Sequence, residues 1–143
     1  MLDIINETSM WVGFSKDDPV RPHLNQLFRI SSNRTMFGLF NEDLTECRAI
    51  VCVAFTDDVA TTEEELKNKG NNTAMFYTVW SYEKGAGREI ILQTVDWIKQ
   101  NKPKIKRFVT LSPKTEMARK FHTRNGAFQL QENNDTINYE YEV

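Results

Sequence analysis

The chain has 143 residues, of which 18 are basic and 20 acidic, for a formal net charge of −2, and 40% of the residues are hydrophobic. A chain of this length buries enough apolar surface to fold without disulfides or metals, so we expect a single domain over 1–143. No apolar run reaches the ~18 residues that a membrane helix needs, and the first residues lack the pattern of a signal peptide. These features predict a cytoplasmic protein with no membrane partner.

The N-terminal part predicts a short strand and then a helix. Met10–Phe14 is an apolar run of strand length, and the polar cluster at 15–19 is typical of a turn that precedes a helix. Apolar residues then recur at helical spacing from Asp18 or Pro22 until the polar stretch at 31–33.

Two strands follow, Thr35–Phe40 and Ala49–Thr56, and the polar loop between them indicates a hairpin. Cys47 and Cys52 are the only cysteines, five residues apart. We therefore expect them on opposite faces of the second strand, as reduced thiols.

The middle of the chain predicts a short acidic helix, a buried strand and a long helix. Thr62–Glu65 has the form of a capping box, and Gly70 is a candidate C-cap. Ala74–Ser81 is predicted to be a buried strand that runs directly into a helix ending before Pro103.

The C-terminal part predicts a strand at Arg107–Leu111, a helix that begins at Pro113, and a closing hairpin made by 127–131 and 136–141. Three side chains of this helix are expected to face the core: Met117, Ala118 and Phe121. The order of elements indicates an α/β fold with one parallel crossover in a mixed sheet.

The charge is unevenly distributed along the chain. The segment Lys99–Arg124 has nine basic residues and one acidic residue, a local charge of +8 that leaves −10 for the remainder. A basic segment can bind the phosphates of a nucleic acid or of a nucleotide cofactor, whereas an acidic remainder repels DNA and favours a cationic substrate. A solvated surface is the alternative interpretation.

The junction of strand and helix at Ser81–Arg88 is the most informative stretch. Gly85 and Gly87 permit a tight turn that aims several backbone N–H groups at one point, the positive end of a helix dipole. We expect an anion there, most naturally a diphosphate, although a structural turn without a ligand is also consistent. No Gly-Lys-Ser/Thr follows, and Ile90 stands where a dinucleotide fingerprint has its third glycine, so neither motif applies.

At this loop the sequence resembles the GNAT superfamily of acetyl-coenzyme-A-dependent N-acetyltransferases. The pyrophosphate loop of that family is Gln/Arg-x-x-Gly-x-Gly/Ala, and Tyr82–Gly87 matches it except for Tyr82 at the first place. The family motif Asn-x-x-Ala-x-x-Leu-Tyr-x-Lys-x-Gly-Phe is matched in spacing by Thr115–Ala127, with His122 in place of Tyr. The resemblance covers about 35–143, and earlier residues only by element order. The small size and the substitutions also resemble acetyltransferase-like proteins of marine phages, which would place the chain in the host cytoplasm.

The resemblance implies a mixed, mostly antiparallel central sheet with helices on both faces. It also implies that the fourth and fifth strands are parallel and splay apart beyond a bulge, and that a β-hairpin ends the chain. Acetyl-CoA would be the cosubstrate, with no metal.

The resemblance also implies roles for individual residues. Backbone amides would hold the pyrophosphate of coenzyme A at five positions: Lys84, Gly85, Ala86, Gly87 and Arg88. Val79, Trp80 and Ser81 would lie beside the thioester. His122 would donate a proton to the leaving thiolate or act as a base on the amine.

The implied function is transfer of an acetyl group to a primary amine of a small molecule or a protein, by a monomer or a homodimer. The strand Ala74–Ser81 has no carboxylate, so the base remains open between Glu83, Asp57, Asp58 and a water chain. Two alternatives are a catalytically inactive GNAT-fold binding module and a GNAT-like enzyme that modifies nucleic acid bases. Both would use Lys99–Arg124 as their interface.

Overall fold

The computed structural model describes all 143 residues, and its eight strands form one mixed sheet in the order β1-β2-β3-β4-β5-β8-β6, with β7 paired to β8. The strands are β1 (Leu2–Ile5), β2 (Arg34–Phe40), β3 (Cys47–Thr56), β4 (Thr73–Ser81), β5 (Arg107–Thr110), β6 (Ser112–Pro113), β7 (Ala127–Glu132) and β8 (Thr136–Tyr141). Every pair is antiparallel except β4 and β5, which are parallel. The predicted α/β class, the parallel pair and the C-terminal hairpin are therefore confirmed.

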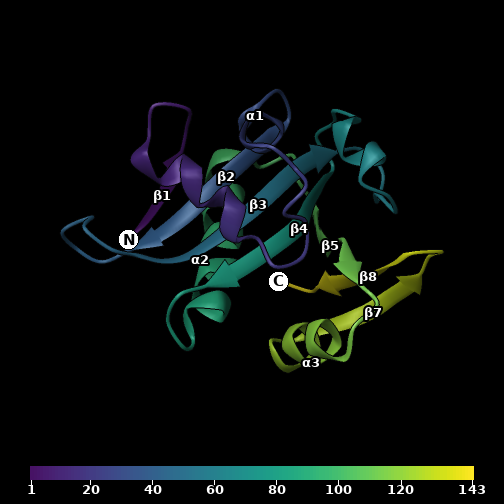
Figure 1. Ribbon diagram of the computed structural model, residues 1–143. Helices are drawn as coiled ribbons and strands as arrows, with labels where there is room; N and C mark the ends of the chain where they lie inside the picture. Colours follow the sequence, from purple (N-terminus) through teal and green to yellow (C-terminus); the bar gives the residue numbers. More distant parts are fainter.

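Helices cover both faces of the sheet, as predicted (Figure 1). The long helix α2 (Ala86–Asn101) packs on one face, while the 3-10 helix η1 (Met10–Asp17) and the short helix α1 (Gln26–Ile30) lie on the other. The remaining helices are the 3-10 helix η2 (Glu64–Lys67) and α3 (Glu116–Arg124), which lies beside β7. Alternate residues of β3 supply both core layers, since Val51 and Val53 face α2 whereas Ile50 and Ala54 face η1 and α1.

The strands β4 and β5 pair over only four residues, from Thr73 opposite Arg107 to Phe76 opposite Thr110. A bulge interrupts β4 at this point, because the register with β3 slips at Tyr77. Beyond Thr110 the chain continues as β6, which pairs with β8 instead of β4. The two parallel strands therefore splay apart beyond a bulge, as the resemblance implied.

The prediction for the N-terminal residues was wrong. Residues 10–14 belong to a 3-10 helix, and the first strand is β1, whose alternation is too weak to recognise. Ser9 caps the 3-10 helix by accepting a hydrogen bond from the Trp11 N–H (3.2 Å), and the Trp11 ring packs against Phe14 and Phe40. Aromatic residues three apart share one face of a 3-10 helix, which is why these residues are not extended.

Three helix boundaries were also misplaced. The helix α1 begins only at Gln26, because Asn25 caps it by accepting from the Phe28 N–H (2.8 Å). Gly70 is not a C-cap: its N–H donates to the Phe55 carbonyl, and a Cβ there would meet the Asp57 backbone. Pro113 lies in β6, and α3 begins after its N-cap, Thr115.

Side-chain directions differ from prediction at two further places. Met117 on α3 is 82% exposed, whereas Ala118 and Phe121 are half-buried. Cys47 and Cys52 are both free and both contact the core layer beneath η1. They lie on the same face because the register of β3 slips between Cys47 and Ala49, which offsets the alternation by one residue.

Candidate functional site

The loop from β4 to α2 presents several unpaired backbone donors. The Ala86 N–H donates to the Glu83 carbonyl (3.1 Å), and Glu89 N–H donates to the Gly85 carbonyl (3.3 Å). The N–H groups of Lys84, Gly85, Gly87 and Arg88 have no acceptor in the chain. Four of the five predicted amides are thus free at the positive end of a 16-residue helix, where an anion is favoured.

The two glycines of this loop are needed for different reasons. Gly85 is the N-cap of α2 with a left-handed φ of 85°, and a Cβ there would meet nothing within 4 Å. A Cβ on Gly87 would lie 3.2 Å from the Phe121 ring, so this glycine lets α2 approach α3. Gly85 supplies the turn, and Gly87 supplies the close packing of the two helices.

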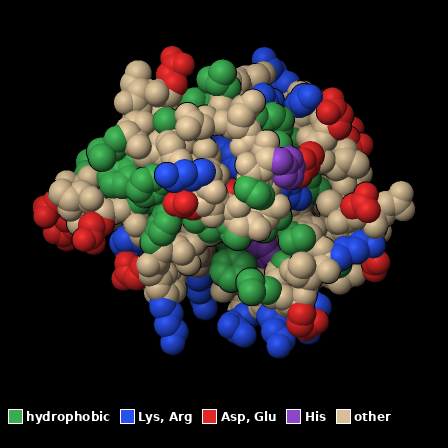
Figure 2. Space-filling model, in the orientation of Figure 1, with side chains coloured by type: hydrophobic (Ala, Val, Ile, Leu, Met, Phe, Trp, Pro, Cys, Tyr) green, Lys and Arg blue, Asp and Glu red, His purple; other side chains and the backbone are tan.

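Positive charge surrounds the free donors. Both acidic residues of the loop region are paired with Arg48, whose guanidinium lies 2.7 Å from Glu83 and 3.0 Å from Glu89. Lys84 and Arg88 are exposed and form no ion pair. Figure 2 shows Lys and Arg side chains gathered along the lower edge of the molecule, below this loop and α3.

The splayed part of β4 has free backbone groups on its open edge. Tyr82 N–H donates to the Arg48 carbonyl, and this pair sets the alternation of hydrogen bonds along the two strands. By that alternation the backbone groups of Trp80 and Thr78 form hydrogen bonds with β3. The N–H and C=O groups of Val79 and Ser81 point to the opposite edge of β4, where β5 no longer pairs with it. The Trp80 side chain instead packs in the core, and its indole N–H donates to the hydroxyl of the exposed Tyr82 (2.9 Å).

His122 lies on α3 and is 6% exposed. Its Nδ1 is 2.8 Å from the Tyr141 hydroxyl, and its ring stacks on Tyr139. Burial lowers the pKa of His122 to about 4, so the imidazole is neutral at pH 7. The packing of α3 against β8 thus removes the near-neutral pKa that a solvent-exposed histidine has.

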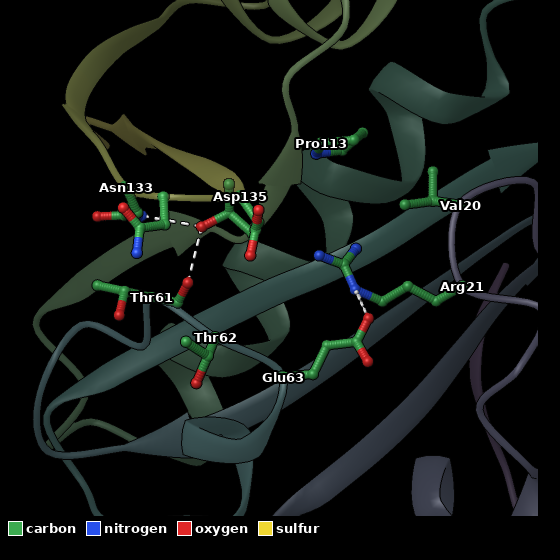
Figure 3. A pocket seen from close by; sticks show the side chains of 10 residues that line it. Val20, Arg21, Thr61, Thr62, Glu63, Pro113, Asn133 and Asp135 are labelled. Carbon is green, nitrogen blue, oxygen red and sulfur yellow. Dashed lines mark hydrogen bonds and ion pairs between the residues drawn. The ribbon is translucent and has the colours of Figure 1, made fainter.

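A polar cavity of about 550 Å³ lies beside the splay (Figure 3). It is lined by the segment before α1, the loop between β3 and β4, β6 and the turn between β7 and β8, through Val20, Arg21, Thr61, Thr62, Glu63, Pro113, Asn133, Asn134, Asp135 and Thr136. The cavity cannot be recognised in the sequence, because its residues come from four separate segments and form no motif.

A buried ion network holds one wall of the cavity. Arg29 and Asp18, both fully buried, form an ion pair of 2.8 Å, and Arg29 also donates to the Arg21 carbonyl (2.7 Å). Asp18 accepts from the Thr78 hydroxyl of β4 (2.8 Å). Burial alone would raise the pKa of Asp18, but its hydrogen bonds, including one from the Arg21 N–H, hold that pKa below its usual value. The network fixes Arg21 next to the bulge, where its guanidinium donates to the Tyr77 carbonyl.

The carboxylates considered as bases lie in different places. Glu83 is held by Arg48 at the β4–α2 loop. Asp57 accepts from the Asn71 N–H (2.9 Å), and together with Asp58 it lines a separate small cavity at the far end of β3. Glu63, which is not among these three, faces the large cavity and lies 2.9 Å from the Arg21 guanidinium.

The basic segment does not form one surface. Lys99 lies in the last turn of α2, and the lysines at 102, 104 and 106 lie between α2 and β5, whereas Lys120 and Arg124 lie on α3, beyond the other end of β5. Its other three basic residues are paired with carboxylates: Arg107 with Glu140, Lys114 with Glu132 and Arg119 with Glu116. No helix is long and apolar enough to cross a membrane, and no three His, Cys, Asp or Glu side chains are grouped to hold a metal ion.

No family model and no curated protein matches the chain. Solved structures of the same fold do match. The GNAT domain of S. lividans PAT aligns with a TM-score of 0.69 and 12% identity over 99% of this chain and 89% of that domain. A Bacillus subtilis acetyltransferase in complex with CoA aligns with a TM-score of 0.62 and 11% identity over 99% of this chain and 97% of its own.

A malonyl-CoA decarboxylase from Agrobacterium vitis aligns with a TM-score of 0.70 and 22% identity over 85% of this chain. The alignment covers 35% of the decarboxylase, so this chain spans about a third of its length. Together these likenesses show that the chain has the GNAT fold.

Proposed function

We propose that the protein transfers an acetyl group from acetyl-CoA to a primary amine. The observation that supports this most is the set of four free N–H groups at the N-terminus of α2, continuous with the open backbone edge of β4. The diphosphate of acetyl-CoA would accept hydrogen bonds from these N–H groups. Its pantetheine arm, which ends in the thioester, would lie along the open edge of β4. The CoA complex of the Bacillus subtilis acetyltransferase, a protein of the same fold, supports the same ligand.

In this proposal each part of the site has one task. The amides of Lys84, Gly85, Gly87 and Arg88 hold the pyrophosphate, and Lys84 and Arg88 add positive charge. The free groups of Val79 and Ser81 pair with the amides of the pantetheine arm. A backbone N–H on the same edge stabilises the oxyanion that forms when the amine attacks the thioester carbonyl.

The proton steps need one acceptor and one donor. The amine must lose protons to attack, and Glu63 in the cavity or water bound to it takes them. His122 is neutral, and if Tyr141 donates to Nδ1, the hydrogen is on Nε2 and can donate a hydrogen bond to the leaving thiolate, which takes its proton from the acylated amine or from water. Of the two roles that the resemblance implied for His122, we propose the one on the leaving thiolate.

A second candidate is decarboxylation of an acyl-CoA. It is favoured by one observation: the decarboxylase domain shares 22% identity with this chain, against 11–12% for the two acetyltransferases. Incubation with malonyl-CoA and detection of acetyl-CoA by mass spectrometry distinguishes the two. A third outcome, binding of CoA without turnover of either substrate, would indicate an inactive GNAT-fold module.

The proposal is tested by calorimetric titration with acetyl-CoA, followed by mass spectrometry of mixtures with amine acceptors. Gly85→Asn and Gly85→Asp form a matched pair, because both side chains tolerate a positive φ and only Asp adds a negative charge at the anion site. We expect micromolar binding by the parent, a modest loss for Asn and at least a tenfold loss for Asp. Equal affinities of the two variants would show that the loop is only a turn.

A further inference from the structure

We infer that the large cavity binds the acceptor, and that the acceptor is a small zwitterion with an anionic group, such as a carboxylate, close to its amine. This inference rests on the proposed acetyl transfer and names its substrate class. The cavity touches both strands of the splay: Arg21 is bonded to the Tyr77 carbonyl on β4, and Pro113 lies on β6. A molecule bound there has its amine next to the open edge of β4, where the thioester would lie.

Arg21 is the anion-binding group of the cavity. Two of its nitrogens have partners in the chain: Nη1 donates to the Tyr77 carbonyl, and Nε forms an ion pair with Glu63 at 2.9 Å, without hydrogen-bond geometry. Nη2 has no partner in the chain, and Figure 3 shows the guanidinium aimed into the cavity between Glu63 and Pro113. The side chain is only 4% exposed, so the cation is held in place and largely desolvated. A carboxylate that meets this donor forms a strong, charge-assisted hydrogen bond.

Two carboxylates provide the ammonium-binding side. Glu63 reaches the cavity from the β3–β4 loop, where it also contacts Arg21 and the exposed His23 (2.8 Å), and Asp135 reaches it from the β7–β8 turn and has no partner within the chain. With Arg21 these groups give the lining a formal charge of −1, which favours an acceptor with at least one ammonium group.

The rest of the lining selects for polarity and size. Hydroxyl and amide side chains predominate, and Val20 and Pro113 are the two apolar exceptions. The volume of about 550 Å³ lies within the range of ordinary small-molecule sites. A lysine side chain of a protein substrate has no carboxylate beside its amine, so this lining favours a free small molecule.

The test compares pairs of ligands that differ by one carboxylate. Lysine and cadaverine, ornithine and putrescine, and serine and ethanolamine are titrated by calorimetry into the full chain, with and without CoA, and then supplied as acceptors with acetyl-CoA. We expect at least one amino acid to bind, and to react, at least tenfold better than its decarboxylated partner. Arg21→Lys keeps the charge but not the planar donor set, and should reduce this preference severalfold, with the fold checked by circular dichroism.

Asp135→Asn should weaken amino-acid binding severalfold, while Asp43→Asn, on the exposed loop between β2 and β3, is the matched control and should leave it unchanged. Three results would each overturn the inference: amines that bind as well as the corresponding amino acids, no binding by any member of the panel, or equal effects of the two Asp variants. Failure of acetyl-CoA to bind would instead overturn the proposed function, because the titrations without CoA still report on the cavity.

Discussion

At the scale of single residues, His122 shows how packing changes chemistry. The ring is enclosed by Phe121, Tyr139 and Tyr141, and no carboxylate or carbonyl compensates a positive charge on it. Desolvation therefore dominates and lowers its pKa to about 4. The sequence identified the position through its spacing, but the local pKa depends on side chains of β8 that arrive from 19 residues further along.

This burial makes a prediction for stability. Between pH 6.5 and about 4 the unfolded chain binds a proton at His122 that the folded chain does not, so the free energy of unfolding falls as the pH falls through this range. The full shift corresponds to roughly 3 kcal/mol at most. Urea unfolding at pH 7 and pH 4.5 should show a smaller difference for His122→Phe than for the parent. Equal differences would mean that His122 titrates normally in the folded state.

The same side chain makes a prediction for turnover. A group that acts on the departing thiolate matters in the transition state and little for cofactor affinity. We expect His122→Phe to reduce kcat by ~10²-fold with CoA affinity nearly unchanged, and His122→Tyr to retain more activity. Steady-state rates and calorimetry on the three proteins check this. Identical rates would show that His122 only supports the packing of α3 on β8.

At the scale of elements, the strands β2 to β5, the closing hairpin and α2 could be predicted from the sequence, whereas the N-terminal segment and β6 could not. Apolar runs such as Ala49–Thr56 and Ala74–Ser81 form strands that are largely buried on both faces. A continuous apolar run of this length identifies such a strand in the sequence, whichever elements pack against it. The segment before β2 is instead shaped by tertiary contacts, namely aromatic packing onto Phe40 and the ion pair of Asp18 and Arg29. The cavity wall that includes Arg21 was missed for the same reason.

The network beneath this segment gives a prediction at the element scale. Arg29→Met removes the guanidinium that neutralises fully buried Asp18, and loss of one partner of a buried pair costs about 3–5 kcal/mol. Arg48→Met, which breaks more exposed pairs with Glu83 and Glu89, is the control and should cost under about 1 kcal/mol. Urea unfolding measures both, and Arg29→Met/Asp18→Asn should recover part of the loss. Similar costs for Arg29→Met and Arg48→Met would show that the network does not anchor the segment.

At the scale of the whole molecule, the fold divides the basic segment that is continuous in the sequence. The strand β5 separates the lysines at 99–106 from Lys120 and Arg124, so only the second group lies near the β4–α2 loop. There it adds to the charge of Lys84 and Arg88 around the free amides. The net charge of +8 on Lys99–Arg124 is therefore divided between two smaller basic patches. The patch next to the β4–α2 loop is suited to the phosphates of a single nucleotide.

This division argues against a nucleic acid partner. Tight binding to a polyanion needs many cations along one face, and here three basic residues of the segment are already paired while the remainder of the chain carries −10. We expect only weak, salt-sensitive binding to DNA or RNA, with a Kd above the micromolar range at physiological salt by fluorescence anisotropy. Lys120→Glu should weaken CoA binding more than Lys104→Glu, because only the first lies on α3 beside the loop. Submicromolar affinity for DNA or RNA at physiological salt, lost on Lys104→Glu, would favour a nucleic acid function instead.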